Sequence, residues 1–540
     1  MNRSIASGVF SVVSAKVIVL VVTAVSTPLL YRFLGASAFG DYAFLLSVFA
    51  IYMIFVSSGI TDGVRKFLAE DRNAANWSEH VVGFYFRLAI VLAAVGSLLL
   101  VAAAQFGIVA LAFGDELTIY FYALAVLVLT AQFRDYARKT LMGFGLERYS
   151  EPLKVLDKLG FVVVAIPLVY VGYGVMGALA GHLFASALVA AVGLVLVHRR
   201  ISLSCLFSRP TKRFPRAEML TFNSMSIVLV FLLMSLYHID IVMLQRFAES
   251  SDVGNYRAAL TLAEFLWFVP LALQTVYVHS TSELWSNNRH RKITELASRT
   301  TRYTFLLTAV MAVGLAALAD IAVPLYFGSE AEPAVTPLLL LLPGALGFAL
   351  ARPILAVSQG NGTLRYPVAA TGTAAVINVS LNAALIPRYG MHGAAIATSV
   401  GYGTMFAFHC WSARLVGFNP LADARLGQVT VTTVLAAIPI VALSMAIPNQ
   451  LLALAVVPPV GFVIFLVFAL LTGALDPAEP FEILAAFPDP IGSRADSVHS
   501  RLEGRLSGDT TRNWLQNLLF VAGLSLLVSG LALGILDASI

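Results

Sequence analysis

The thirteen-residue segment Leu30-Tyr-Arg-Phe-Leu-Gly-Ala-Ser-Ala-Phe-Gly-Asp-Tyr42 has a related copy later in this chain. Its second copy reads Leu244-Gln-Arg-Phe-Ala-Glu-Ser-Ser-Asp-Val-Gly-Asn-Tyr256, at an offset of 214 in the numbering and with six of thirteen positions identical. Two more matches have nearly the same offset. Gly143-x-Gly145 pairs with Gly360-x-Gly362, and Tyr173-Gly-Val-Met-Gly-Ala178 pairs with Tyr389-Gly-Met-His-Gly-Ala394. Self-similarity at one spacing indicates an internal duplication.

The composition places this duplicated chain in a membrane. The 540 residues are 59% hydrophobic and 12% charged, with a mean hydropathy of +0.84. Soluble domains usually have about 25% charged residues. The composition therefore excludes an ordinary soluble enzyme and a disordered chain. Two cysteines are too few for a disulfide scaffold.

Apolar runs long enough to cross a bilayer follow one another along the chain, since about 20 apolar residues are needed for one helical span. Their full length favours helices over the shorter alternating strands of a membrane barrel. The first twelve form two sets of six, and the repeat matches fall at equivalent places in both sets. The candidate spans are 9–31, 42–60, 81–107, 117–133, 155–171, 174–197, 221–244, 255–279, 303–327, 335–357, 367–387, 390–411, 429–447, 450–473 and 514–536.

These features predict an all-α protein, a polytopic membrane helical bundle. Because six is an even number, the two six-helix lobes face the same way and are related by a pseudo-twofold axis along the membrane normal. Two or three extra C-terminal spans follow. The predicted organisation is a six-span N-terminal lobe at 1–198, a basic cytoplasmic linker at 199–218, a six-span C-terminal lobe at 219–415, spans 13 and 14 at 416–475, and a polar segment with a possible fifteenth span at 476–540.

Lysine and arginine are concentrated in alternate loops, which sets the orientation. The pattern predicts a multi-pass protein of the cytoplasmic (plasma) membrane with a cytoplasmic N-terminus. The net charge of +5 and pI near 9.1 fit loops that face anionic membrane lipids, so no nucleic-acid partner is inferred.

Three patterns resemble a known family. They are Leu30-Tyr-Arg-Phe-Leu-Gly…Phe-Gly-x-Tyr42, Asp240-x-x-Met-Leu…Val253-Gly-x-Tyr, and Asn378…Asn382…Ile386-Pro…Gly390-x-x-Gly-Ala-Ala-x-Ala-Thr398. Over about 1–475 the chain is similar to the oligosaccharide-lipid flippases of the multidrug/oligosaccharidyl-lipid/polysaccharide exporter superfamily. The resemblance implies two lobes, twelve to fourteen spans, and movement of a lipid-linked glycan by alternating access. Segment 476–540 departs from that pattern.

Charged residues inside predicted spans are the candidate site, because a charge in the bilayer normally faces a cavity or a partner. The cations could hold the phosphate or pyrophosphate of a lipid-linked oligosaccharide in a central cavity. The substrate-binding candidates are Lys16, Arg257, Arg87, Glu264 and Asp240. The resemblance adds weight to cations on spans 1 and 8. Arg32 and Arg246, which the repeat relates, are expected to act at a gate or to fix the lobe ends.

Alternatives stay open for several of these residues. Arg87 is near enough to the cytoplasmic edge to reach the interface. Asp240 either pairs with Arg246 or Arg257 or has a functional role. Glu264 either binds a coupling cation or neutralises a nearby cation.

The favoured function is outward translocation of a lipid-linked oligosaccharide, with membrane lipids as partners and a coupling cation as a further candidate partner. No cofactor, metal site, ATP-binding loop or nucleophile–base arrangement is recognisable, so no enzyme is predicted. A cation-coupled multidrug exporter of the same superfamily is the alternative. It is less favoured because the first span has Lys16 and no acidic residue. A membrane glycan polymerase or ligase would need a large outer loop, which the sequence lacks.

Overall fold

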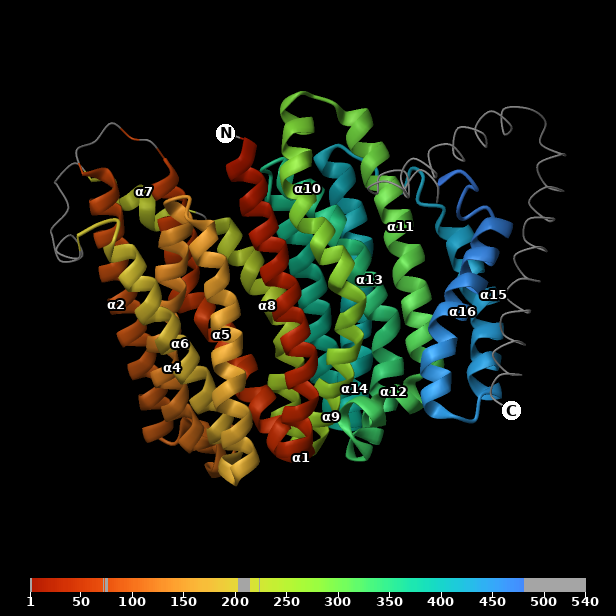
Figure 1. Cartoon of the computed structure of the whole chain (residues 1–540), viewed down its shortest axis with the longest axis horizontal. Helices are drawn as coiled ribbons and strands as arrows, with labels where there is room; N and C mark the ends of the chain where they lie inside the picture. Colours follow the sequence, from red (N-terminus) through yellow and green to blue (C-terminus); the bar gives the residue numbers. More distant parts are fainter. Residues whose placement is uncertain (1, 71, 73–75, 203–213, 223, 480–540) are drawn as a thin grey trace. The chain divides into compact units, whose positions relative to one another are not determined.

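A computed structural model describes all residues except 1, 71, 73–75, 203–213, 223 and 480–540. Within helices, the side chains of residues 2–14, 16, 58, 225, 275, 276 and 279 are also outside the description. The described chain forms helices (Figure 1). They are α1 Asn2–Ala69, α2 Trp77–Gln105, α3 Ile108–Phe113, η1 Asp115–Leu117, α4 Thr118–Gly143, α5 Glu147–Leu168, η2 Val169–Tyr173, α6 Gly174–His198, α7 Arg216–Thr221, α8 Ser224–Phe247, α9 Ser250–Ala263, η4 Glu264–Trp267, α10 Phe268–Ser286, α11 His290–Ala317, α12 Ala319–Phe327, η5 Ser329–Ala334, α13 Val335–Gly360, α14 Arg365–Val416, α15 Leu426–Ala446 and α16 Gln450–Leu471.

Eleven helical stretches of the described chain are long and apolar enough to cross a membrane, so the protein is a multi-pass membrane protein. Three of them, Val17–Ser57, Glu147–His198 and Arg365–Val416, are 41, 52 and 52 residues long. Each is long enough for two crossings and contains a glycine with non-helical backbone angles. The eleven stretches therefore account for the first fourteen predicted spans. The possible fifteenth span lies outside the described residues, as does most of the predicted basic linker.

The duplication is visible in the backbone itself. Gly174 has φ 50° and ψ −137°, and its repeat partner Gly390 has φ 53° and ψ −131°. Gly145 and Gly362, a second matched pair, have φ values of 68° and 77°. Glycine adopts these positive φ values without a Cβ clash. The internal repeat predicted from the sequence is thus confirmed at these positions.

The chain divides into two compact units. Unit 1 comprises Met1–Thr261, Val323–Leu341 and Pro367–Tyr402, and unit 2 comprises Leu262–Ala322, Leu342–Tyr366 and Gly403–Ile540. Unit 1 therefore contains the whole first repeat together with three separate parts of the second. The predicted lobe boundaries at 198 and 219 stay predictions.

In unit 1, helices α4, α5 and α6 lie side by side and pack on α1 (Figure 1). Small residues permit this packing. A Cβ on Gly181 of α6 would lie 2.6 Å from Cβ of Ala165 on α5. Close approach of small residues is a main source of helix association in lipid, where apolar surface gains little from burial. Large exposed apolar side chains such as Leu111 and Val163 are consistent with a lipid-facing exterior.

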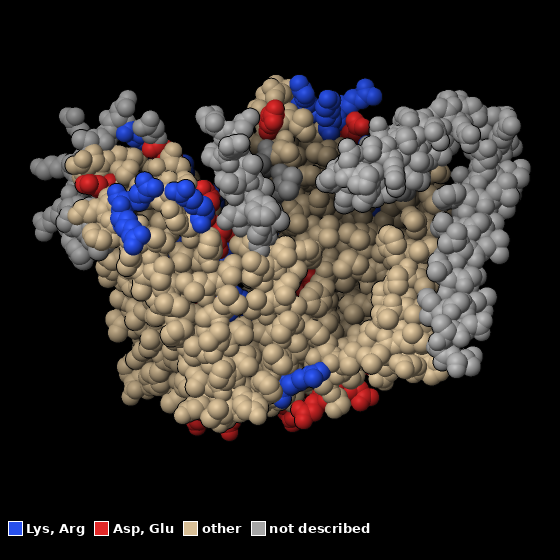
Figure 2. Space-filling view, in the orientation of Figure 1, with Lys and Arg blue, Asp and Glu red and all other residues tan. Residues whose placement is uncertain are grey.

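Charged side chains of unit 1 are segregated along its helices. Figure 2 shows lysine and arginine gathered at the end of this unit where α7 lies. Several are paired there: Arg72 with Glu218, Lys139 with Asp62, and Lys154 with Glu151. This is the clustering that the loop pattern of the sequence predicts. That this end faces the cytoplasm stays a prediction.

In unit 2, α15 and α16 pack on each other and on α11. An ionic cluster joins α11 to the segment that follows α16. Arg302, 1% exposed, pairs with Glu479 and also with Asp423 at 3.4 Å. Arg425 donates two hydrogen bonds to Asp476, of 3.0 and 2.8 Å. We call this set of five residues the ionic clamp.

Candidate substrate and coupling site

Asp240 on α8 is a fully buried carboxylate in unit 1, one of the residues that the sequence singles out. The Tyr256 hydroxyl of α9 donates to its Oδ2. Thr398 Oγ1 of α14 donates to the same atom at 3.0 Å, and the Ile241 N–H donates to Oδ1 at 2.8 Å. A buried charge requires such partners. These three partners are neutral groups, so their hydrogen bonds do not neutralise the negative charge of the Asp240 carboxylate.

Two asparagines of α14 extend this cluster. Asn378 Nδ2 donates to Thr398 Oγ1 at 3.4 Å, and Asn382 Nδ2 donates to Asn378 Oδ1 at 3.2 Å. Both asparagines are fully buried, and within the described chain Oδ1 of Asn382 has no hydrogen-bond donor. One carboxylate, two amide oxygens and two hydroxyls are hard oxygen ligands, a set suited to a proton or a small hard cation. We call Asp240, Tyr256, Asn378, Asn382 and Thr398 the aspartate cluster.

A second polar contact of unit 1 joins Tyr42 on α1 to His182 on α6. The Tyr42 hydroxyl lies 2.9 Å from His182 Nε2 and shares a hydrogen bond with it. The imidazole stacks on Phe161 of α5, with ring centres 4.1 Å apart. Sequence analysis did not select His182, because a lone histidine in an apolar helix has no spacing pattern. The repeat offset of 216, which aligns it with Thr398, is the signal that could have found it.

Arg257 on α9 adjoins the aspartate cluster along the chain. It is half-buried and follows Tyr256 directly. The structure thus places Arg257 next to the tyrosine that hydrogen-bonds Asp240, the other residue of this region selected from the sequence.

The other selected residues are placed as follows. Arg87 is half-buried on α2 in unit 1, and Glu264 is half-buried at the start of η4 in unit 2. Lys16 lies on α1, and its side chain is outside the description. Substrate binding by these three residues stays a prediction.

The repeats meet in unit 1 close to Arg32 and Arg246. Arg32 donates a hydrogen bond to the Leu325 carbonyl, whereas Arg246 is exposed and lies over the Phe247 ring at 5.8 Å. Between the repeats, the Tyr31 hydroxyl donates to Asn255 Oδ1 at 2.7 Å. Gln245 Nε2 donates to Asp41 Oδ1 at 3.1 Å. Tyr31 and Gln245 are related by the offset of 214, and so are Asp41 and Asn255. The two hydrogen bonds are therefore equivalent under the pseudo-twofold relation of the repeats.

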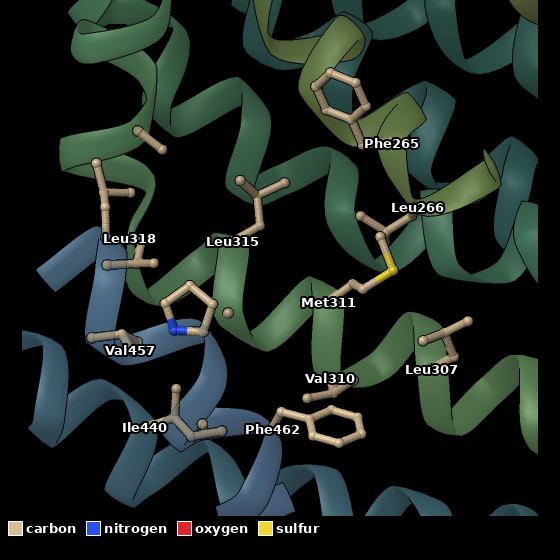
Figure 3. A pocket seen from close by; sticks show the side chains of 15 residues that line it. Phe265, Leu266, Leu307, Val310, Met311, Leu315, Leu318, Ile440, Val457 and Phe462 are labelled. Carbon is tan, nitrogen blue, oxygen red and sulfur yellow. The ribbon is translucent and has the colours of Figure 1, made fainter. Parts of the chain in front are cut away.

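An apolar cavity of about 380 Å³ lies within unit 2 (Figure 3). Figure 3 shows Met311 of α11, Ile440 of α15 and Val457 and Phe462 of α16 pointing into it. No charged residue is among its lining residues. Such a cavity suits hydrocarbon and cannot neutralise a phosphate.

Comparison with known proteins gives two family matches. A family of polysaccharide biosynthesis proteins matches residues 5–273, and the MatE family matches residues 226–384. An uncharacterised membrane protein MJ1068 of Methanocaldococcus jannaschii is 22% identical over 60% of this chain and 65% of its own length. A probable low-salt glycan biosynthesis flippase, Agl15 of Haloferax volcanii, is 25% identical over 32% of this chain and 36% of its own. The matches thus span less than two thirds of either relative.

Solved structures share the fold at low sequence identity. The lipid II flippase MurJ in an inward closed conformation has a TM-score of 0.70 at 13% identity, covering 86% of this chain and 98% of that one. An inward-facing multidrug resistance MATE family transporter has a TM-score of 0.62 at 16% identity, covering 73% and 94%. The predicted fold class, an all-α membrane bundle, is confirmed by this likeness.

Proposed function

Because the chain belongs to the multidrug/oligosaccharidyl-lipid/polysaccharide exporter superfamily and is a transporter, we propose that it moves a lipid-linked oligosaccharide outward across the cytoplasmic membrane. The match to polysaccharide biosynthesis proteins over residues 5–273 supports a glycan substrate. A relative described as a probable glycan biosynthesis flippase supports it too. The protein would alternate between an inward-open and an outward-open state while the lipid tail stays in the bilayer.

The observation that carries the proposal is Arg257, a half-buried cation on a membrane-spanning helix, directly after the tyrosine that hydrogen-bonds Asp240. A phosphate cannot cross hydrocarbon without charge compensation, and a guanidinium can bind phosphate through two parallel hydrogen bonds. Arg257 would hold the head group, with Lys16 and Arg87 as further cationic contacts. Arg32 and Arg246 would serve the outer gate.

Energy for transport would come from a cation gradient acting at the aspartate cluster. Asp240 has the oxygen-rich surroundings that such an ion requires, and its hydrogen-bond partner Tyr256 directly precedes Arg257 in the chain. An ion bound there would weaken the attraction of Asp240 for Arg257 and free the arginine for an anionic head group. Glu264 is a second candidate for the ion.

A cation-coupled multidrug exporter is the second candidate function. The MatE match over 226–384 favours it, since that stretch includes Asp240 and Asn378. An exporter of cationic drugs would gain nothing from Arg257, because like charges repel. Substrate charge therefore distinguishes the two functions.

The test uses full-length protein in liposomes with a fluorescent polyprenyl pyrophosphate-linked sugar, called the labelled lipid below. Transport is measured as protection of the fluorophore from a membrane-impermeant quencher. We expect Arg257→Ala to lose most transport and Arg257→Lys to keep part of it. Arg388→Ala on α14, an exposed arginine to which the proposal gives no role, serves as the matched control. Normal transport by well-folded Arg257→Ala and Lys16→Ala variants would overturn the cationic site, and transport of a cationic dye instead would favour the exporter.

A further inference from the structure

Arg352 on α13 is a buried arginine of unit 2 that the proposed function does not use. Its side chain is 7% exposed. It lies in Ser329–Gly360, the membrane-spanning stretch with the largest buried share among those that the structure describes. Arginine cannot be deprotonated in proteins. A full positive charge therefore lies inside unit 2.

The guanidinium of Arg352 lacks hydrogen-bond acceptors. Its Nε and Nη1 atoms are buried, and neither donates a hydrogen bond to a residue of the described chain, carboxylates included. Burial of a charge without a counter-ion or acceptors is strongly unfavourable, so proteins pair or hydrogen-bond nearly all such groups. Two buried donors without acceptors on one guanidinium point to a ligand that supplies the oxygens.

Arg302 on α11 shows how unit 2 treats a buried arginine that has a structural role. It is 1% exposed, and it pairs with Glu479 and with Asp423 in the ionic clamp. Arg352 is nearly as buried, but no carboxylate of the described residues accepts a hydrogen bond from its Nε or Nη1. It thus has the burial of a structural arginine without the partners of one.

Aromatic rings fix the position of Arg352. Its Cζ atom lies 5.0 Å from the centre of the Phe348 ring, one turn earlier on α13. Phe348 packs on Trp267 of η4, with ring centres 4.5 Å apart, and Trp267 Nε1 donates to the Ala345 carbonyl at 2.9 Å. The Phe348 ring stabilises the guanidinium charge through its π face but provides no oxygen acceptor. The cation is thus held in place while its N–H donors stay available.

We propose that Arg352 is an anion-binding site within unit 2 that takes an oxyanion, either a phosphate or a carboxylate. A guanidinium presents parallel N–H donors that match two oxygens of such a group. The lipid-linked substrate offers two sources of this chemistry, its pyrophosphate and the carboxylate of an acidic sugar. The inference rests on the proposed function only for the source of the anion.

The first test uses the sign of a stability change to separate a binding group from a structural one. Replacing an unpaired buried charge with an apolar side chain removes its desolvation cost. Arg352→Met should therefore raise the unfolding temperature of the full-length protein in detergent and phosphate-free buffer. Inorganic phosphate should raise the unfolding temperature of the wild type above its value in sodium chloride of equal ionic strength, because a ligand of the folded state stabilises it. Arg352→Met should lack this response.

Arg302→Met is the matched control. It should be less stable than the wild type and should keep the phosphate response. Arg352→Lys retains the charge without the planar set of donors, so its phosphate response should be weaker than that of the wild type. Two outcomes would overturn the anion site. One is an Arg352→Met variant less stable than the wild type without phosphate, which would reveal protein partners for the guanidinium. The other is an equal phosphate response in both proteins.

The second test identifies the source of the anion with two forms of the labelled lipid, one with a neutral sugar and one with a hexuronic acid. Loss of hydrogen bonds to a charged group should lower the affinity of Arg352→Met about ten- to hundredfold. A loss for both lipids assigns the phosphate, and a loss for the uronic acid form alone assigns the carboxylate. Unchanged affinity for both would refute a role in substrate binding. A wild type that responds to phosphate through Arg352 but transports neither lipid would refute the proposed function alone.

Discussion

Gly40 and Gly254, which the sequence repeat relates, lie backbone against backbone in unit 1. A Cβ on Gly40 would lie 1.8 Å from the Ser250 carbonyl oxygen, and one on Gly254 would lie 1.9 Å from the Ala36 carbonyl oxygen. Because Ala36 and Ser250 are themselves repeat partners, both repeats present the same surface to each other. The local twofold axis passes between these two glycines.

We predict that Gly40→Ala separates the repeats at this contact. The methyl group has no space, and overpacking of this kind costs about 1–3 kcal/mol. Spin labels at positions 33 and 247, which are exposed and repeat-related, should report a shift to longer distances. Gly403→Ala is the matched control, because a Cβ there meets no neighbour within 4 Å. An unchanged distance distribution in Gly40→Ala would contradict this prediction.

We predict that Asp240→Asn removes the dependence of transport on an ion gradient. The amide preserves the size of the side chain but not its charge, so Tyr256 and Thr398 keep a partner while a cation loses its attraction. A typical coupling free energy of about 1–3 kcal/mol between two ligands corresponds to a 5–150-fold change in affinity, and this is the size of the effect that the variant should lose. Transport of the labelled lipid is measured with imposed sodium or proton gradients. Asp320→Asn, at an exposed position, should behave as wild type, and gradient-driven transport by Asp240→Asn would count against the coupling role.

We predict that Arg302→Met destabilises unit 2 strongly. The substitution leaves the mostly buried carboxylate of Glu479 without its cationic partner. Removing one member of a buried ion pair costs about 3–5 kcal/mol. Thermal unfolding in detergent provides the measurement. The double variant Arg302→Met/Glu479→Gln should recover part of the loss, and equal unfolding temperatures for wild type and Arg302→Met would show that the ionic clamp contributes nothing.

We predict that the ionic clamp weakens in acid through Asp476. The two hydrogen bonds from Arg425 hold the pKa of Asp476 below its ordinary value of 3.8. A carboxyl whose pKa is lower in the folded state stabilises the protein above its unfolded pKa and loses that effect as pH falls through the folded pKa. Stability should thus fall below about pH 4. Asp476→Asn should be less stable at neutral pH and less sensitive to acid, and an identical acid profile in this variant would refute the assignment.

Much of the fold was predictable because hydropathy and duplication are both properties of the sequence. The repeat glycines Gly174 and Gly390 mark equivalent backbone positions, and fourteen of the fifteen predicted spans correspond to described helices. Hydropathy did not predict that spans 1 and 2 follow each other without a loop, with the helix broken at the non-helical angles of Gly35. Hydropathy averaged along the sequence reports the length and polarity of a segment. It contains no information about the backbone angles at a glycine.

The candidate site was predictable only in part, because partners distant in sequence decide the role of a charge. Asp240 was selected as a substrate-binding candidate, which stays a prediction; its side chain is buried, and one tyrosine and one threonine hydroxyl hydrogen-bond it. Arg302, which directly precedes the predicted span 303–327, was not selected from the sequence, yet it is buried against Asp423 and Glu479, 121 and 177 residues away. Local patterns contain no information about such pairings.

The matching angles at Gly174 and Gly390 have a consequence for tracing ancestry. A φ near 50° with a ψ near −135° belongs to a turn conformation that side chains other than hydrogen occupy at a large steric cost. The transported substrate can change, and lipid-facing residues can be substituted, without altering the requirement for glycine at these two positions. These two glycines can therefore serve as registration marks for aligning the halves of distant homologues whose remaining sequence no longer reveals a gene duplication.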